Sequence, residues 1–315
     1  MLLSMGPSSG LTVVIPAYNE AEAIEQTITA VKQALTGIKR QTEILVVDDG
    51  SSDDTAAIAT GCGVQVICHP INSGYGRALF TGIEAATYDT VVIVDADGTY
   101  PIKYLPDLVS LYDRGFDMVV GARQGHHYDG SLGKRMLRVI FRFLVEFASG
   151  RSIPDINSGF RAFSRAPVLA VRASLSSGFS FTTTITLLFL LNHLFVGYLP
   201  IPYNKRVGKS RVHLFPDGLR SLQIIITAFA QYNPVKLGLL LILLNLGGNL
   251  ILVILSLGLL LMERSFWVIL AMAWNTAYLI MGFTFLALML IRHKGRISLS
   301  TGRSPQAGST SHGSK

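Results

Sequence analysis

The stretch VVIVDADGTYP, residues Val91–Pro101, runs from apolar strand-forming residues into two aspartates one residue apart and then a Gly-Thr-Tyr-Pro turn. Alternate side chains of an extended strand point the same way, so Asp95 and Asp97 are predicted to face one point. A divalent cation accepts such oxygen ligands and leaves room for substrate phosphates. The alternative is a turn at the end of the strand, in which both aspartates only cap the helix that follows.

Apolar runs and helical stretches alternate through the first half of the chain, which predicts an α/β fold with a mostly parallel sheet and helices on its faces. In such folds ligands bind beyond the carboxyl ends of the strands. Strands are expected within residues 11–20, 43–50, 64–69, 90–97 and 117–123, and helices at 20–35, from about 53 onward and at 74–86.

The hydrophobic fraction of the 315-residue chain is 50%, and much of it lies in two uncharged runs, residues 237–262 and 266–291. Each run exceeds the roughly 20 residues that span a bilayer, so two transmembrane helices are predicted within 235–292. Basic residues flank both ends of this hairpin, which places the α/β domain and the C-terminus on the cytoplasmic side. The net charge of +7 is then assigned to anionic headgroups of the lipid bilayer, and nucleic acid is not expected as a partner.

Basic residues also lie among apolar ones at helical spacing in residues 131–149, which predicts an amphipathic helix in the membrane interface. A helix that packs on the core with a solvated face is the alternative. A second interface helix is expected at 213–234. The domain order is then an N-terminal segment (1–10), a catalytic domain (11–212), the second interface helix, the membrane hairpin and a disordered tail (293–315).

Polar residues gather at the ends of three of the expected strands. A nucleotide needs an acceptor for a base N–H, a wall for its ring and a metal on its phosphates, and the residue types match these needs. The clusters are Pro16, Tyr18 and Glu20; Asp48, Asp49 and Ser51; and Asp95 with Asp97.

In the order and spacing of these clusters, residues 11–211 resemble the GT-A-fold glycosyltransferases of family 2, and within them the polyprenyl-phosphate glycosyltransferases. The resemblance implies a nucleotide-sugar donor, a polyprenyl phosphate acceptor and a Mg²⁺ or Mn²⁺ cofactor. It also implies that Asp95 and Asp97 bind the metal as the family's DXD motif. The residues implied to hold the base and ribose are Pro16, Tyr18, Glu20 and Asp48.

Two further segments resemble family motifs on the acceptor side. The segment DINSGFRAF, residues 155–163, resembles D-x-x-S-G-F-R, which implies that Ser158, Gly159 and Arg161 shape the pocket for the sugar. Asp155 is expected either to act as a base or to orient Arg161. The segment YNKRVGKSRV, residues 203–212, resembles a basic element near the lipid phosphate, although simple attraction to anionic headgroups is an alternative. The candidates for lipid-phosphate binding are Arg123, Arg135, Arg206, Lys209, Ser210 and Arg211.

The predicted reaction is an inverting transfer of a hexose to the lipid phosphate at the cytoplasmic membrane face. A phosphate monoester has a second pKa near 6, so the acceptor needs no strong base at neutral pH. UDP-glucose is the expected donor by resemblance, and GDP-mannose or another acceptor is an alternative. A membrane-bound nucleotide-sugar sensor without turnover is a further alternative. Small and polar residues of the hairpin, such as Gly247, Asn245 and Asn275, suggest a homo-oligomer.

Overall fold

The computed structural model describes residues 10–125, 142–147, 149–170, 181–204, 234–260 and 270–285, with positions 139, 222, 223, 226 and 287. The chain divides into two compact units, residues 1–225 and 226–315. This boundary falls inside the expected second interface helix, most of which lies outside the described residues. Each unit is described below by itself.

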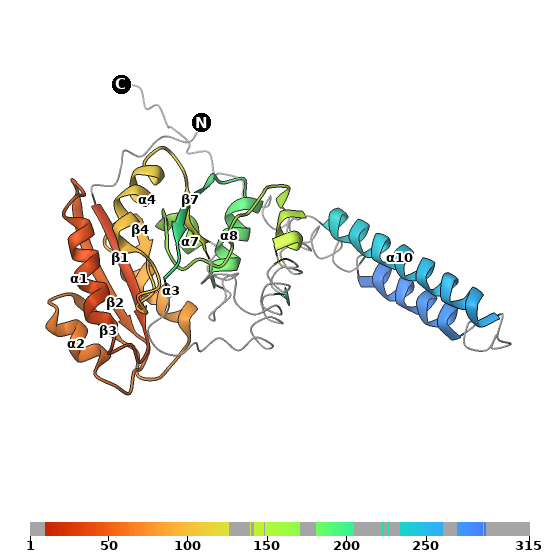
Figure 1. The fold of residues 1–315 in the computed structure, drawn as a ribbon, viewed down its shortest axis with the longest axis horizontal. Coiled ribbons are helices and arrows are strands. Elements are labelled where there is room, and N and C mark those ends of the chain that lie inside the picture. The colour runs from red at the N-terminus through yellow and green to blue at the C-terminus, as the bar shows by residue number, and fades with distance from the viewer. Residues whose placement is uncertain are drawn as a thin grey trace, which may run out of the picture. The chain divides into compact units, whose positions relative to one another are not determined.

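A seven-stranded sheet forms the centre of the first unit, in the order β3-β2-β1-β4-β6-β5-β7 (Figure 1). The pairs β1–β2, β2–β3, β1–β4 and β5–β7 are parallel, and β6 runs antiparallel between β4 and β5. The strands are β1 (Gly10–Ala17), β2 (Gln41–Asp48), β3 (Gln65–Cys68), β4 (Thr90–Ile93), β5 (Met118–Gln124), β6 (Arg161–Ser164) and β7 (Val196–Pro202). The prediction of an α/β fold with a mostly parallel sheet is confirmed.

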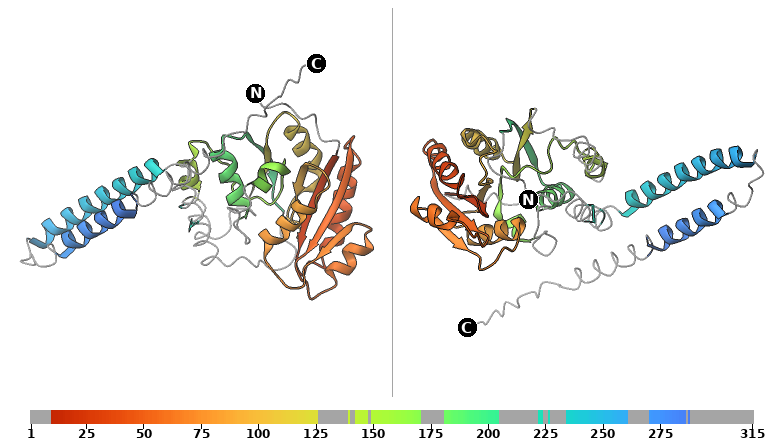
Figure 2. Two further views of the ribbon diagram at one scale, coloured as in Figure 1. Left: turned by 180° about the vertical axis from the view of Figure 1, so that it is seen from behind. Right: turned by 60° about the horizontal axis from the view of Figure 1, so that its bottom comes forward.

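Helices cover both faces of the sheet (Figures 1 and 2). One apolar core joins the sheet to α1 (Ile24–Leu35), α2 (Thr55–Gly61) and α4 (Leu105–Tyr112), which follows the short helix η1 (Ile102–Tyr104). The other core joins it to α3 (Tyr75–Ala85), α7 (Arg165–Ala170) and α8 (Phe181–Leu191). Neighbouring residues of β1 alternate between these cores, with Val13 in the first and Val14 in the second, as the two-residue period of a strand requires.

Strand β4 is shorter than the sequence predicts. It ends at Ile93, so Asp95 and Asp97 lie in the turn that follows and not in the strand. The argument that strand periodicity directs both carboxylates to one side is therefore wrong, because these residues are no longer extended. What orients each aspartate is its own hydrogen bonds, described below.

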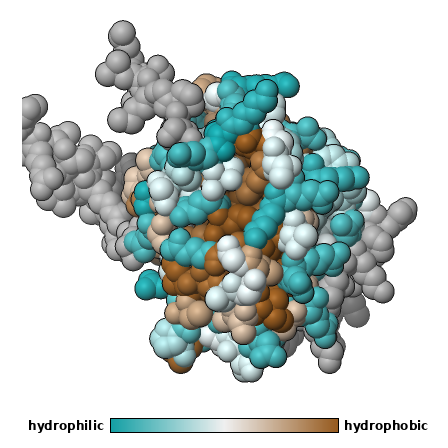
Figure 3. All heavy atoms as spheres, turned by 90° about the vertical axis from the view of Figure 1, so that its left-hand side faces the viewer, coloured by the Kyte–Doolittle hydropathy of each residue, from teal (hydrophilic) through white to brown (hydrophobic). Residues whose placement is uncertain are grey.

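The end of the first unit that carries α1 and α2, at the left in Figure 1, is shown in Figure 3. A strip of apolar surface lies there between rows of hydrophilic side chains. Apolar atoms make up more than half of the surface of folded proteins, so this strip by itself identifies no binding site.

The second unit contains α10 (Pro234–Leu260) and a second helix, residues 270–285, which lie side by side in both views (Figures 1 and 2). The Asn245 side chain donates a hydrogen bond from Nδ2 to Oδ1 of Asn275, at 3.1 Å, and both residues are buried. Large apolar side chains such as Leu243 and Trp274 are exposed instead. This pair of helices therefore exposes large apolar side chains and buries an asparagine pair between them, whereas most large apolar side chains of the first unit lie in its two cores.

Counting only residues that the structure describes in full, no helix is long and apolar enough to cross a membrane. The two predicted transmembrane helices therefore stay a prediction. The expected interface helix at 131–149 lies largely outside the described residues, although 142–147 are helical with Phe143 exposed. The expected disordered tail, 293–315, lies outside them entirely.

Candidate functional site

The carboxyl ends of β1 and β2 lie side by side, because Ala17 pairs with Asp48 in the parallel ladder. The loops that follow are tied together through Asn19, whose backbone N–H donates to Oγ of Ser51 at 2.8 Å. Asn19 has a φ of 50°, and its side-chain oxygen accepts from the backbone N–H of Ser52 at 2.7 Å. The structure thereby gathers the predicted donor-binding residues of these two strands at one edge of the sheet. They are Pro16, Tyr18, Glu20 and Asp48.

Asp49, the second aspartate after β2, organises a loop that is distant in sequence. Its carboxylate accepts hydrogen bonds from the backbone N–H groups of Ser73 at 2.9 Å and Gly74 at 2.7 Å. It also lies 2.7 Å from Nδ1 of His69. Asp49 is buried, and these contacts determine the path of the chain into helix α3.

The two aspartates after β4 have different partners. Oδ1 of Asp95 accepts a hydrogen bond from the Tyr75 hydroxyl at 2.7 Å. Oδ1 of Asp97 accepts from the backbone N–H of Thr99 at 3.1 Å and from its hydroxyl at 2.6 Å. Asp97 therefore closes a tight local turn, and neither η1 nor α4 has a side-chain cap, so the alternative that the aspartates cap the next helix is not what the structure shows. Asp95 is oriented by a side chain 20 residues earlier in the chain.

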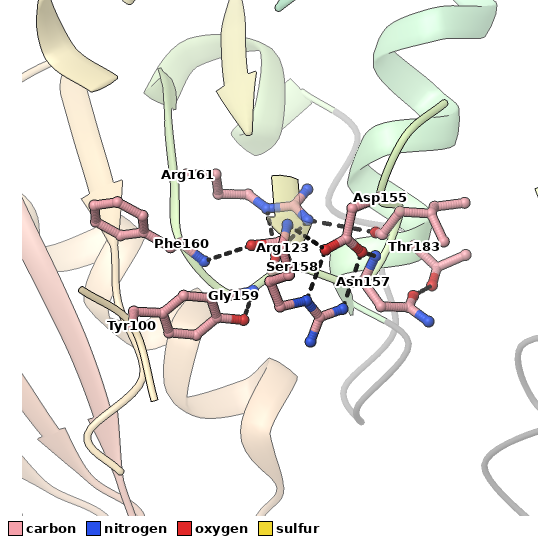
Figure 4. Close-up of polar contacts among 10 residues, drawn as sticks. Tyr100, Arg123, Asp155, Asn157, Ser158, Gly159, Phe160, Arg161 and Thr183 are labelled. Carbon is pink, nitrogen blue, oxygen red and sulfur yellow. Dashed lines mark hydrogen bonds and ion pairs between the residues drawn. The ribbon is translucent and has the colours of Figure 1, made fainter. Parts of the chain in front are cut away.

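Gly159 of the segment 155–163 lies directly against Asp95. A Cβ atom at position 159 would come within 2.4 Å of Oδ2 of Asp95, so only glycine fits there. The backbone N–H of Gly159 donates to the Tyr100 hydroxyl at 2.6 Å (Figure 4). Tyr100 follows the aspartate turn, so this turn and the segment 155–163 are in direct contact.

Asp155 forms a two-pronged ion pair with Arg123 at the end of β5 (Figure 4). Nε of Arg123 lies 2.6 Å from Oδ2 and Nη2 lies 2.9 Å from Oδ1. Burial raises the pKa of the Asp155 carboxyl, but the charge and hydrogen bonds of Arg123 and the backbone N–H of Asn157 outweigh it and lower the pKa below its usual value. Asp155 is therefore an ionised carboxylate with weak basicity.

Arg161 is fully buried, and its guanidinium binds oxygen atoms of the protein. It donates to the carbonyl oxygens of Ser158 at 3.0 Å and Thr182 at 3.2 Å, and to the hydroxyl of Thr186 at 2.9 Å. Burial lowers the pKa of this guanidinium. The carboxylate of Asp155 pairs with Arg123, so the expectation that Asp155 orients Arg161 is not what the structure shows. Arg161 instead ties the segment 155–160 to helix α8.

Polar residues of α8 complete this attachment. The stretch FTTTIT, residues 181–186, is buried throughout, and the Thr183 hydroxyl donates to the side-chain oxygen of Asn157 (Figure 4). Buried hydroxyls need partners, and that of Thr183 finds one in the segment that carries Asp155 and Gly159. Thr183 and Thr186, which binds Arg161, thus attach this segment to α8.

The donor set at Asp95 and Asp97 fits Mg²⁺ or Mn²⁺. In the part of the chain that the structure describes, no three His, Cys, Asp or Glu side chains are grouped to hold a metal ion by themselves. Mg²⁺ is commonly bound by one or two carboxylates together with substrate phosphates and water. Two aspartates beside a nucleotide site match this pattern, since a diphosphate would supply the remaining oxygens.

The basic element begins next to the aspartate turn. The backbone N–H of Asn204 donates to the carbonyl of Thr99 at 3.0 Å, and the guanidinium of Arg123 lies 5.3 Å from the ring centroid of Tyr203. Tyr203 also packs edge-on against Tyr100. The predicted phosphate-binding residues Arg135, Arg206, Lys209, Ser210 and Arg211 lie outside the described residues.

Three tyrosines were not predicted as site residues, although the structure places them in it: Tyr75, Tyr100 and Tyr203. Tyr100 and Tyr203 lie within motifs quoted above, and Tyr75 lies near the start of the helix expected at 74–86. Their partners are 20 to 80 residues away in the chain, with Tyr75 bonded to Asp95 and Tyr203 against Arg123. Local spacing carries no signal for such contacts.

Comparison with known proteins gives the family. Residues 12–171 match the model of glycosyl transferase family 2. A dolichyl-phosphate hexose transferase of Haloferax volcanii is 31% identical over 214 residues, which is 66% of this chain and 89% of that protein. The low-salt glycan biosynthesis hexosyltransferase Agl6 of the same organism is 34% identical over 227 residues, 70% of this chain and 54% of that protein.

A solved structure of glucosyl-3-phosphoglycerate synthase from Mycobacterium tuberculosis shares the fold, with a TM-score of 0.58, 22% identity, and coverage of 70% of this chain and 79% of that one. This likeness supports the GT-A-like architecture alone. The chain spans about half the length of several of the curated relatives that it matches. The family model and the nearly complete coverage of the dolichyl-phosphate hexose transferase show that this chain belongs to glycosyl transferase family 2.

Proposed function

We propose that the chain is an inverting glycosyltransferase that moves a hexose from a nucleotide sugar to a polyprenyl or dolichyl phosphate. The observation that carries the proposal is the contact between Asp95 and Gly159, which joins a metal-type aspartate pair to the segment expected on the acceptor side. The names of relatives support the choice of acceptor, since they include a dolichyl-phosphate hexose transferase and undecaprenyl-phosphate transferases.

The donor is proposed to bind at the carboxyl ends of β1, β2 and β4. Pro16, Tyr18, Glu20 and Asp48 would contact the base and ribose, and Asp95 with Asp97 would hold Mg²⁺ or Mn²⁺ on the diphosphate. When bound, such an ion stabilises the negative charge that develops on the leaving nucleotide diphosphate. UDP-glucose is the first donor to test, because it is the donor expected from the subgroup that the sequence resembles.

An oxygen of the lipid phosphate is proposed to attack the anomeric carbon of the sugar as the nucleotide diphosphate leaves on the opposite side, with inversion. The acceptor is largely dianionic at neutral pH and needs no general base. The lowered pKa of Asp155 argues for the orienting role over the role of base, because an efficient base has a pKa near the working pH.

Arg123 is the proposed target of that orientation. Its guanidinium is held by Asp155 along one edge and lies over the ring of Tyr203. A guanidinium fixed in this way presents its remaining N–H groups in a defined direction, which suits a phosphate. Arg135, Arg206, Lys209, Ser210 and Arg211 are proposed to complete the binding of the lipid phosphate.

We further propose that the two helices of the second unit anchor the enzyme in the membrane, with the catalytic unit at the cytoplasmic face. The supporting observation is their inverted polarity, with Asn245 and Asn275 bonded to each other inside and large apolar side chains outside. Polar residues in membrane helices usually face a neighbouring helix in this way. Both asparagines, named above for self-association, are paired within one hairpin.

The test is transfer of radiolabel from a panel of nucleotide sugars to polyprenyl phosphate in the presence of Mg²⁺ or EDTA. Metal-dependent labelling of the lipid supports the proposal and identifies the donor. Tight binding of a nucleotide sugar without lipid product from any donor contradicts it, and favours the sensor or a different acceptor. Labelling of the lipid with GDP-mannose alone would support the proposed reaction and identify GDP-mannose, in place of UDP-glucose, as the donor.

A further inference from the structure

Tyr75 opens helix α3 and directs its hydroxyl at Asp95, at 2.7 Å from Oδ1. In this contact the hydroxyl is the donor and the carboxylate is the acceptor. A donor at one oxygen restricts rotation of the carboxylate plane.

The Asp95 carboxylate also lies against the backbone of Gly159. A Cβ at this position would come within 2.4 Å of Oδ2, 2.6 Å of Oδ1 and 2.7 Å of Cγ. Gly159 is itself held by its N–H bond to the Tyr100 hydroxyl. The carboxylate is thus confined between a hydrogen-bond donor from α3 and the backbone of the segment 155–160.

The position of Tyr75 is determined by contacts at the carboxyl end of strand β2. Asp49 binds the backbone N–H groups of Ser73 and Gly74, the two residues before Tyr75. Gly74 has a φ of 97°, a conformation that favours glycine and turns the chain sharply into α3. A carboxylate at the end of β2 thereby determines where a tyrosine meets the carboxylate after β4.

We propose that Tyr75 is a positioning residue for the divalent cation at Asp95, and that Asp49 sets its place through the loop 69–74. This inference rests on the metal site of the proposed function. Groups that hydrogen-bond to a metal-binding carboxylate orient it, and their removal typically weakens metal affinity about 10–100-fold. Tyr75 would act through Asp95 and not by touching the metal or the sugar.

The experiment compares the full chain with its Tyr75→Phe variant by titrating Mn²⁺, with free Mn²⁺ measured by electron paramagnetic resonance, in the presence and absence of UDP. We expect the variant to bind Mn²⁺ about tenfold more weakly. The affinity for UDP measured in EDTA should not change, because Tyr75 acts on the metal ligand alone. A general loss of packing would weaken both.

Tyr112→Phe is the matched control. The Tyr112 hydroxyl is also partly buried and hydrogen-bonded, with Oγ of Ser164 at 2.7 Å, on the other face of the sheet. The Tyr112→Phe substitution should leave the Mn²⁺ affinity unchanged. Wild-type Mn²⁺ affinity in folded Tyr75→Phe would overturn the positioning role. Absence of Mn²⁺ binding by the wild-type chain, with and without UDP, would instead overturn the metal site itself.

Asp49→Asn provides a second variant. The amide keeps one acceptor oxygen but cannot accept from both Ser73 and Gly74 as the carboxylate does, so the loop before Tyr75 should loosen. We expect a smaller loss of Mn²⁺ affinity than in Tyr75→Phe, in the same direction. Unchanged affinity in folded Asp49→Asn would show that Asp49 does not set the place of Tyr75.

Discussion

Asp155 begins the segment that carries Gly159, and Asp95 lies against that segment, but the described contacts of the two aspartates differ in kind. Asp155 is paired edge to edge with a guanidinium. Asp95 accepts from a neutral hydroxyl and is confined by backbone. A permanent cation lowers the pKa of a carboxylate and holds it in place, whereas a neutral donor orients a carboxylate and leaves its charge available. The first arrangement suits a structural and orienting carboxylate, and the second a ligand for an exchangeable metal ion.

The largest effect on activity is expected at the second aspartate of the proposed metal pair. Asp97→Ala should lower the rate of sugar transfer to polyprenyl phosphate by about 10²–10³-fold, a loss typical for removal of one group that stabilises developing charge. The rate of formation of labelled lipid at a saturating concentration of the nucleotide sugar measures this loss. Asp107→Ala, at an exposed position of α4, is the control and should retain activity. Equal rates in the two variants would contradict the metal role.

The largest effect on the free energy of unfolding is expected at the ion pair between Asp155 and Arg123. Asp155→Asn leaves Arg123 with a reduced partner in a buried place, and we expect the free energy of unfolding to fall by about 3 kcal/mol. Urea denaturation followed by circular dichroism measures it. The matched control is Asp113→Asn, whose partner is Arg40 and whose side chain is 49% exposed. The free energy of unfolding of that variant should fall by less than about 1 kcal/mol. Similar losses in both variants would refute the distinction between the buried and the exposed ion pair.

A smaller change tests the confinement of Asp95. Gly159→Ala places a methyl group 2.4 Å from Oδ2 of Asp95, so the carboxylate must move. We expect about a tenfold loss of Mn²⁺ affinity, comparable to other changes beside a metal ligand. Gly61→Ala is the control, because nothing lies within 4 Å of a Cβ at that position. Wild-type Mn²⁺ affinity in Gly159→Ala would show that the Asp95 carboxylate is not confined there.

The smallest effect concerns pH. The pKa of Asp155 is lower in the folded chain than its usual value of 3.8, so the folded state binds this proton less readily than the unfolded state. The stabilisation that follows is present above about pH 4 and is lost as the pH falls through the lowered pKa. The difference in unfolding free energy between wild type and Asp155→Asn should therefore narrow below pH 4. A constant difference between pH 7 and pH 3 would contradict this origin.

The sequence predicted the first half of the fold well, since each expected strand from β1 to β5 is present and parallel neighbours follow from the alternation with helices. It did not predict β6, because Arg161–Ser164 was interpreted only as part of a motif. A four-residue strand with a buried arginine has no strand signature of its own. Its place between β4 and β5 depends on pairings with residues 40 to 75 positions away.

Among the candidate site residues, Asp95 and Asp97 were selected by their place after an expected strand, and Asp155 and Gly159 by resemblance to a family motif. The partners of these residues were not predictable in the same way. Asp155 was expected beside Arg161, yet it pairs with Arg123, because β5 and the segment before β6 bring residues 123 and 155 together. A motif names residue types that occur together, but it does not state which of them touch.

The sequence by itself determined the α/β class, the clustering of carboxylates at strand ends and the apolar character of residues 237–262 and 266–291, because all three are properties of local pattern. The tertiary structure alone decided that Tyr75 meets Asp95, that Asp155 pairs with Arg123 and that Arg161 binds carbonyl oxygens. These contacts join residues that only the order of strands in the sheet brings together. Burial then restricts the choice of partner in each contact, because a buried polar group must find a partner within hydrogen-bonding reach.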